Sequence, residues 1–166
     1  MNPLLPYRII GFLLFPVTAL IGIFVTLAVF IALANPAMLL PIAIAATVVM
    51  YVIGSFIFLQ KAIDRNQVCK SGLRDFIRVN AIVSIVFCFF CINSGIAMIS
   101  NPELIRPAIK QMLEQQPGTG VSEDQMLRIV KGFMYVLSVF SILLVVHIFY
   151  TFRLLKQYQH MFVEKK

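Results

Sequence analysis

The sequence contains one long stretch without any charged residue, the 52 positions between Arg8 and Lys61. A helix that crosses the roughly 30 Å hydrocarbon core of a bilayer needs about 20 mainly apolar residues, so this stretch is long enough for two crossings. Two further apolar stretches of that length follow later in the chain. Runs such as Ile21–Leu33 do not alternate between apolar and polar residues, as barrel strands do. The sequence therefore predicts an all-α integral membrane protein, a four-helix transmembrane bundle. The predicted spans are about 9–34, 37–60, 79–100 and 133–152.

The composition supports this fold class and excludes several others. Of the residues, 60% are hydrophobic and 13% are charged, whereas a soluble domain has about 45–50% apolar and about 25% charged residues. A soluble enzyme, a disordered tail and a nucleic-acid-binding module are excluded on this ground. The first apolar stretch is longer than the roughly 7–15 residues of a signal-peptide core, so we expect it to be retained. We therefore treat 1–166 as a single four-span membrane domain.

The charged residues are divided unevenly between the two sides of the predicted membrane. Ten basic and three acidic residues lie on one side, and four of each lie on the other. Lys and Arg accumulate in the cytoplasmic loops of membrane proteins, so we expect the basic side to be cytoplasmic. Both termini, the loop 61–78 and the tail 153–166 lie on that side, and the loop 101–131 is extracytoplasmic. Anionic lipid is a candidate ligand of the basic 61–78 loop.

In this topology the spans pair into two helical hairpins. Asn35 and Pro36 leave room only for a tight turn between the first two spans. The pattern Asn-Pro-x4-Pro at 35–41 recurs at 101–107, which raises the hypothesis of a duplicated hairpin, since parallel repeats are known in transporters. Coincidence is the alternative, because Asn-Pro is a common turn.

The extracytoplasmic loop contains a predicted amphipathic helix. Its apolar residues recur with helical spacing, and Asn101-Pro102 supplies a cap and a first-turn proline. The segment Pro117–Gly120 breaks this helix. The segment Ser122–Gln125 then has the pattern of a capping box, from which a helix is expected to run through the fourth span to about Tyr158. The apolar face of the loop helix either lies on lipid or docks a partner protein. This face consists of Leu104, Ile105, Ala108, Ile109, Met112 and Leu113.

His147 is the one residue in the four spans that is ionisable and is not a cysteine or a tyrosine. Ionisable residues within a membrane are candidates for function, so a proton relay or a metal ligand is one interpretation. A neutral imidazole that is hydrogen-bonded to a neighbouring helix is the other. We favour the second, because the spans contain no carboxylate that could serve as its partner.

The third span carries a stripe of small and weakly polar residues at helical spacing. It includes the C-x-x-C motif of Cys88 and Cys91, which in other proteins serves redox or metal chemistry. The four-helix quinone-linked disulfide-forming proteins and the vitamin K epoxide reductase family use a second cysteine pair, which this sequence lacks. A packing seam, in which small residues let helices approach closely, is therefore favoured over redox chemistry or the lining of a solute path. The stripe consists of Asn80, Ser84, Cys88, Cys91, Ser94 and Gly95.

These features favour a function that does not involve catalysis. No nucleotide, metalloprotease or nucleophile motif occurs, so we expect neither enzymatic activity nor a cofactor. The leading hypothesis is a non-enzymatic accessory or scaffold subunit, which acts through helix packing and through docking of its outward helix on a membrane-protein partner. The alternative is a small homo-oligomeric transporter or channel whose path is lined by the stripe. In layout the chain resembles small four-helix proteins of the bacterial inner membrane. That resemblance lies in topology alone, implies an inner-membrane location and assigns no residue a role.

Overall fold

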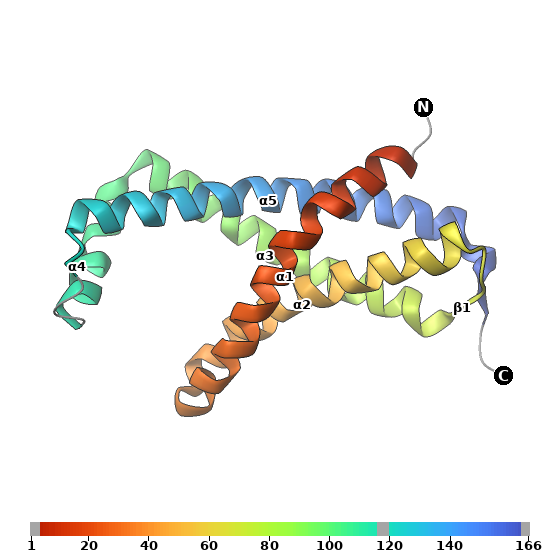
Figure 1. The fold of residues 1–166 in the computed structure, drawn as a ribbon, viewed down its shortest axis with the longest axis horizontal. Helices are drawn as coiled ribbons and strands as arrows, with labels where there is room; N and C mark the ends of the chain where they lie inside the picture. The colour runs from red at the N-terminus through yellow and green to blue at the C-terminus, as the bar shows by residue number, and fades with distance from the viewer. Residues whose placement is uncertain (1–3, 116–119, 164–166) are drawn as a thin grey trace. The chain divides into compact units, whose positions relative to one another are not determined.

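The computed structural model describes residues 4–115 and 120–163, and these residues are mostly helical (Figure 1). Within them, four helices are long and apolar enough to cross a membrane, and the predicted all-α fold is confirmed. The α-helices are α1 (Leu4–Ala34), α2 (Leu39–Phe58), α3 (Ser71–Ser100), α4 (Arg106–Gln115) and α5 (Glu123–Gln157). The predicted helix break at 117–119 and the last charged residues of the tail, 164–166, lie outside the described residues.

A short 3-10 turn, η1 (Pro36–Met38), joins α1 to α2. The side chain of Asn35 caps it, because its Oδ1 accepts a hydrogen bond from the backbone N–H of Ala37 at 3.3 Å. Pro36 stands at the first position of the turn, where a missing N–H leaves no helical hydrogen bond unmade. The turn is short enough for α1 and α2 to pack against each other along their lengths.

The end of α2 continues as a π-helical turn, η2 (Leu59–Asp64). Asn66 stops the helical run with a φ of 54°, a left-handed conformation that asparagine tolerates better than most residues. The chain then forms the short strand β1 (Cys69–Lys70), which pairs in parallel with β2 (Phe162–Val163) near the carboxyl end. An ion pair between Arg8 and Asp64 joins α1 to η2. These contacts tie the beginning and the end of the chain to the 61–78 loop.

The predicted capping box at the start of α5 is confirmed. The backbone N–H of Ser122 donates to Oε1 of Gln125 at 2.9 Å, and the backbone N–H of Gln125 donates to Oγ of Ser122 at 3.3 Å. Two N–H groups that a helix start leaves without partners are thereby satisfied. From this cap α5 runs unbroken to Gln157, as the sequence predicts to within a residue.

The loop helix begins later than the sequence predicts. Residues Pro102–Leu104 form a separate 3-10 turn, η3, and α4 starts only at Arg106. Pro107 explains the difference. It has no N–H to bond to the preceding turn, so it fits only in the first turn of a helix. Asn101 therefore precedes the η3 turn and not α4, and its backbone carbonyl accepts a hydrogen bond from the N–H of Leu104 at 3.3 Å.

The described chain divides into two compact units. One comprises Met1–Phe87 and Leu143–Lys166, and the other comprises Cys88–Ile142. The first unit contains α1, α2, the first part of α3 and the last part of α5. The second unit contains the remainder of α3 and α5 together with α4.

Glycines mark the places where helices approach closely. In the first unit, a Cβ at Gly54 of α2 would lie 3.1 Å from a side-chain carbon of Ile77 of α3. In the second unit, a Cβ at Gly95 of α3 would collide with the Oγ of Ser138 of α5. Close approach of backbones at small residues is the typical way in which helices associate in lipid.

The four long helices leave most of their apolar surface uncovered. In the most apolar 18-residue window of each helical run, only 11% of the residues of α1 are buried, and the share is 17% for α5, 28% for α3 and 39% for the run Pro36–Asp64 around α2. Soluble monomers rarely expose continuous apolar surface of this kind. The uncovered surface therefore needs lipid or another chain.

We predict that Gly95→Ala destabilises the second unit by about 1–3 kcal/mol, the usual effect of overpacking. The added methyl group collides with the Ser138 hydroxyl, which is held by a 2.8 Å hydrogen bond to the carbonyl of Met134. Ser138→Ala in the same chain removes the colliding atom and is expected to restore most of the stability. Unfolding in detergent micelles, followed by circular dichroism, measures both effects.

Gly132→Ala is the matched control, because a Cβ at that position meets no atom within 4 Å. The prediction is contradicted if both glycine variants lose the same stability, or if Ser138→Ala fails to rescue Gly95→Ala.

Candidate functional site

The largest group of connected polar side chains buried in the first unit surrounds His147. The imidazole is 2% exposed, and the neighbouring side chains of Tyr7, Tyr51, Ser55 and Thr151 are equally buried. They come from α1, α2 and α5. We refer to these five residues as the histidine cluster.

Tyr51 of α2 connects to two residues of α5. Its hydroxyl lies 2.8 Å from Nδ1 of His147 and 2.7 Å from Oγ1 of Thr151. The Thr151 hydroxyl donates its single proton to the backbone carbonyl of His147 at 2.9 Å, so it accepts at Tyr51. Tyr51 therefore donates to Thr151 and accepts from His147. These bonds assign the proton of the neutral imidazole to Nδ1 and leave Nε2 as an acceptor.

Tyr7 of α1 covers one face of the imidazole. The two rings are stacked, with centroids 4.6 Å apart and planes 12° apart, and the Tyr7 hydroxyl donates to the backbone carbonyl of Ser55 at 3.3 Å. Gly11 lies one turn further along α1, where a Cβ would be 3.3 Å from Nε2 of His147. Tyr7, Gly11, Ser55 and His147 contribute to the lining of a cavity of about 10 Å³. That is room for about one water molecule.

The cluster is suited to holding three helices in register. Its bonds join α1 to α2 and α2 to α5, and the ring stacking joins α1 to α5. None of the five residues is a carboxylate that could exchange a proton with the imidazole. Among the described residues, no group of three His, Cys, Asp or Glu side chains is placed to hold a metal ion. The geometry supports the structural interpretation of His147.

The stripe of the third span is mostly buried. Asn80, Ser84, Cys88, Cys91 and Gly95 are buried, and Ser94 is exposed. The polar groups nearest the start of α3 bond within their own helix, since Asn80 donates to the carbonyl of Phe76 at 2.8 Å and Ser84 donates to that of Asn80 at 2.7 Å. In the second unit, both cysteine thiols interact with Ser141 of α5. The stripe thus contacts protein along most of its length.

The three cysteines are free thiols. Cys69 lies in β1, outside the apolar helices, and is 5% exposed. Burial raises the pKa of its thiol, and the nearby charge of Lys61 offsets part of that rise. The thiolate is the reactive form, so Cys69 is less reactive at neutral pH than an ordinary exposed cysteine.

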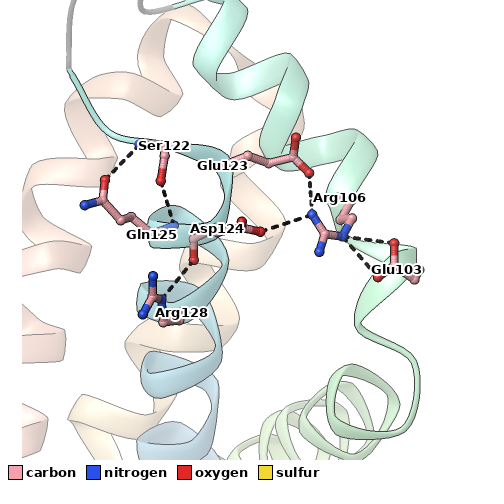
Figure 2. A network of polar contacts seen from close by, with 7 residues as sticks. All are labelled: Glu103, Arg106, Ser122, Glu123, Asp124, Gln125 and Arg128. Atoms are coloured by element: carbon pink, nitrogen blue, oxygen red, sulfur yellow. Dashed lines mark hydrogen bonds and ion pairs between the residues drawn. The ribbon is translucent and has the colours of Figure 1, made fainter.

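In the second unit, Arg106 fixes the start of α4 against the start of α5, as Figure 2 shows. Its Nη1 lies 2.9 Å from Oε1 of Glu123 and 3.3 Å from Oδ1 of Asp124, and its Nε lies 2.9 Å from Oε2 of Glu103. The hydrogen bonds to Glu123 and then to Glu103 are the main causes that raise the pKa of Arg106 above its ordinary value. One guanidinium therefore pairs with three carboxylates, one from η3 and two from the start of α5.

The predicted apolar face of the loop helix is divided in two. Ile109 is 1% exposed, and Ile105 and Leu113 are half-buried on the same side. The other three residues of the face remain uncovered, with Leu104 at 66% and Met112 at 58% exposure. We refer to Ala108 and Met112 of α4, together with Leu104 of the preceding turn η3, as the uncovered stripe of α4.

Tyr7, Gly11 and Tyr51 were not among the site residues expected from the sequence. The partners of His147 lie 96 residues or more before it along the chain, so no local pattern links them. One signal was available. Tyr51 and Ser55, and likewise His147 and Thr151, are four residues apart and so share a helix face. Two polar pairs with this spacing, in otherwise apolar helices, favour contact with each other.

No protein-family model matches the chain, and comparisons with curated proteins and with solved structures also find no match.

We predict that Tyr51→Phe and His147→Phe affect stability non-additively. Removing either partner breaks the same 2.8 Å hydrogen bond, so the double variant loses that bond only once. Hydrogen bonds between membrane helices have coupling energies of about 0.6 kcal/mol on average and up to about 1.7 kcal/mol, and a value in this range is expected. Unfolding by sodium dodecyl sulfate, applied to all four chains of the cycle, measures it.

Tyr135→Phe serves as the control, because Tyr135 is 64% exposed and a surface substitution is usually within about 0.5 kcal/mol. Strictly additive losses in the cycle would mean that the tyrosine and the histidine do not stabilise each other.

Proposed function

We propose that the chain is an integral membrane protein that acts as a non-enzymatic accessory or scaffold subunit. The observation that carries the proposal is the combination of apolar, largely uncovered helices with buried polar groups that bond to each other. The uncovered surface of α1, α3 and α5 suits lipid and partner helices. The interior of the first unit has a cavity near His147 with room for about one water molecule, too small for a substrate.

The distribution of charge supports an orientation in the bacterial inner membrane with both termini in the cytoplasm. The acidic residues beside the 61–78 loop are engaged, Asp64 by Arg8 and Asp75 by Arg74. Among the described residues, the other Lys and Arg side chains on this side are exposed and free to contact anionic lipid headgroups. These are Lys61, Arg65, Lys70, Arg78, Arg153 and Lys156.

The second unit supports docking through α4. The inward side of this helix is taken up by Ile105, Ile109 and Leu113, and its start is fixed by the ion pairs of Arg106. The uncovered stripe of α4 is thereby presented in one orientation. A fixed amphipathic helix with an apolar surface left over is a typical docking element, and we assign it to a membrane-protein partner.

A small homo-oligomeric transporter or channel remains the alternative. It requires the stripe of α3 to face a solute path. The burial of five of its six residues favours packing instead, since a path would leave them accessible to water.

The orientation predicts which engineered cysteines a membrane-impermeant maleimide reaches. In a chain whose three native cysteines are replaced by alanine, Gln111→Cys on α4 should be labelled in intact bacterial cells. Gln67→Cys in the 61–78 loop should be labelled only after the cells are permeabilised. Both positions are exposed in the folded chain, so burial does not hide either one. If only Gln67→Cys is labelled in intact cells, the orientation is the opposite of the one proposed.

The docking proposal predicts a partner that depends on the uncovered stripe of α4. Gentle extraction from the native membrane, followed by mass spectrometry, should find a second chain in fixed stoichiometry with the wild type. The double variant Leu104→Gln and Met112→Gln should lose it, because two exposed apolar contacts are removed. Its melting temperature should stay unchanged, because surface substitutions usually alter stability little.

Lys110→Gln is the matched control, since Lys110 is also exposed on α4 but is not apolar. Retention of the partner by the double variant would show that α4 is not the docking element. A clean homo-oligomer without a second chain would contradict the accessory-subunit proposal and favour the transporter.

A further inference from the structure

In the second unit, a groove of about 370 Å³ lies between α3 and α5. This volume falls within the range of about 300–1,000 Å³ that is typical of ligand sites. Two glycines help to form it, one on each helix, and a Cβ at Gly132 would meet no atom within 4 Å. The lining residues used below are Gly95, Met98, Ile99, Lys131, Gly132 and Tyr135.

The groove lies where both apolar helices approach the edge of the membrane, and this placement rests on the membrane insertion proposed above. On α3 it is lined by residues just before the helix ends at Ser100, and on α5 by residues around the start of the predicted span at 133. Ile99 is 71% exposed and Tyr135 is 64% exposed, so the groove opens away from the protein. Tyrosine is enriched at this depth, where acyl chains meet headgroups.

Lys131 places a positive charge at this groove. Within residues 4–115 and 120–163, Lys131 forms no ion pair. Glu103, Glu123 and Asp124 in the same unit form their ion pairs with Arg106 instead. Lys131 and Tyr135 are four residues apart on α5 and therefore share a helix face. An ammonium and a phenol above an apolar groove are complementary to a phosphate that carries an acyl chain.

We propose that this groove binds one anionic phospholipid, with an acyl chain between Gly95 and Gly132 and the phosphate at Lys131. The absence of a side chain at Gly132, where a Cβ would meet no atom within 4 Å, provides width for the chain, and the backbone of Gly95 contributes to the lining. Met98 lines the inner side with a flexible apolar side chain, which adapts well to an acyl chain. The charge of Lys131 provides the preference for an anionic headgroup over a zwitterionic one.

The chain contains no tryptophan, so a single introduced tryptophan is a unique reporter. Ile99→Trp places it on the groove, and Phe133→Trp places it on the lipid-exposed side of α5, outside the groove and at similar depth. Each protein is reconstituted in phosphatidylcholine nanodiscs that contain the same mole fraction of dibrominated phosphatidylglycerol or dibrominated phosphatidylcholine. Bromine quenches tryptophan fluorescence on contact.

The expected result is stronger quenching of Ile99→Trp by the brominated phosphatidylglycerol and equal quenching of Phe133→Trp by both lipids. Adding Lys131→Gln should lower the preference of the groove for the anionic lipid about fivefold, the effect of one lysine near a membrane surface. Adding Lys110→Gln, which removes a charge away from the groove, should leave it unchanged. Gly132→Leu adds an apolar side chain at a groove-lining position where a Cβ meets no atom within 4 Å, and it should abolish the preference altogether.

Equal quenching of Ile99→Trp by both lipids would overturn the proposal, and so would a preference that survives both Lys131→Gln and Gly132→Leu. Weak quenching of Ile99→Trp by either lipid, in a protein that is dimeric in the nanodisc, would assign the groove to a second copy. If neither tryptophan is quenched, the proposed membrane insertion is contradicted. If Phe133→Trp is quenched and Ile99→Trp shows no preference, only the groove proposal is contradicted.

Discussion

The structure depends on one constraint, which is that polar groups in an apolar environment must find their partners within the chain. Several serine and threonine hydroxyls of this protein satisfy this constraint by bonding within their own helix. Ser84, Ser138, Ser141 and Thr151 each donate to the carbonyl four residues earlier in the same helix. A hydroxyl satisfied in this way presents little polarity to its neighbours and can be packed against another helix. Thr18 is an exception in the described part of the chain, since its buried Oγ1 has no hydrogen-bond partner there.

Local satisfaction of the hydroxyls also allows the helices to approach closely. Where a side chain is absent, the next helix moves in, as at Gly11 beside His147, at Gly54 beside Ile77 and at Gly95 beside Ser138. Association of helices in lipid relies on such close packing, because the hydrophobic effect does not favour a protein neighbour over a lipid tail. The histidine cluster adds direction to this packing. The hydrogen bond to Tyr51 and the stacking on Tyr7 position the imidazole from two helices at once, which fixes both the rotation and the height of α5 in the first unit.

The features that could be predicted from the sequence are those set by neighbouring residues. The four apolar helices follow from length and composition, and the capping box at Ser122 follows from four consecutive residues. The predicted start of α4 was wrong, because the effect of Pro107 on the preceding turn outweighed the Asn-Pro signal at 101. His147 was recognised as a polar site, but its partners were not. They lie 96 and 140 positions earlier in the sequence. Apolar helices carry no sequence pattern that shows which other helix each one packs against, so these contacts could not be predicted.

The same constraint locates where recognition can occur. Inside the first unit the polar atoms of the histidine cluster bond to each other, so that region offers a partner no strong hydrogen-bonding site. Charges without partners lie outside the apolar parts of the helices. In the second unit Lys131 lies beside a groove, and in the first unit exposed basic residues surround the 61–78 loop. The charge of Arg106, in contrast, is used to hold the start of α4 against the start of α5. Polar groups inside the first unit therefore bond within the chain, whereas unpaired charges lie outside the apolar stretches. The proposed assembly with lipid and protein partners rests on this division of polar groups.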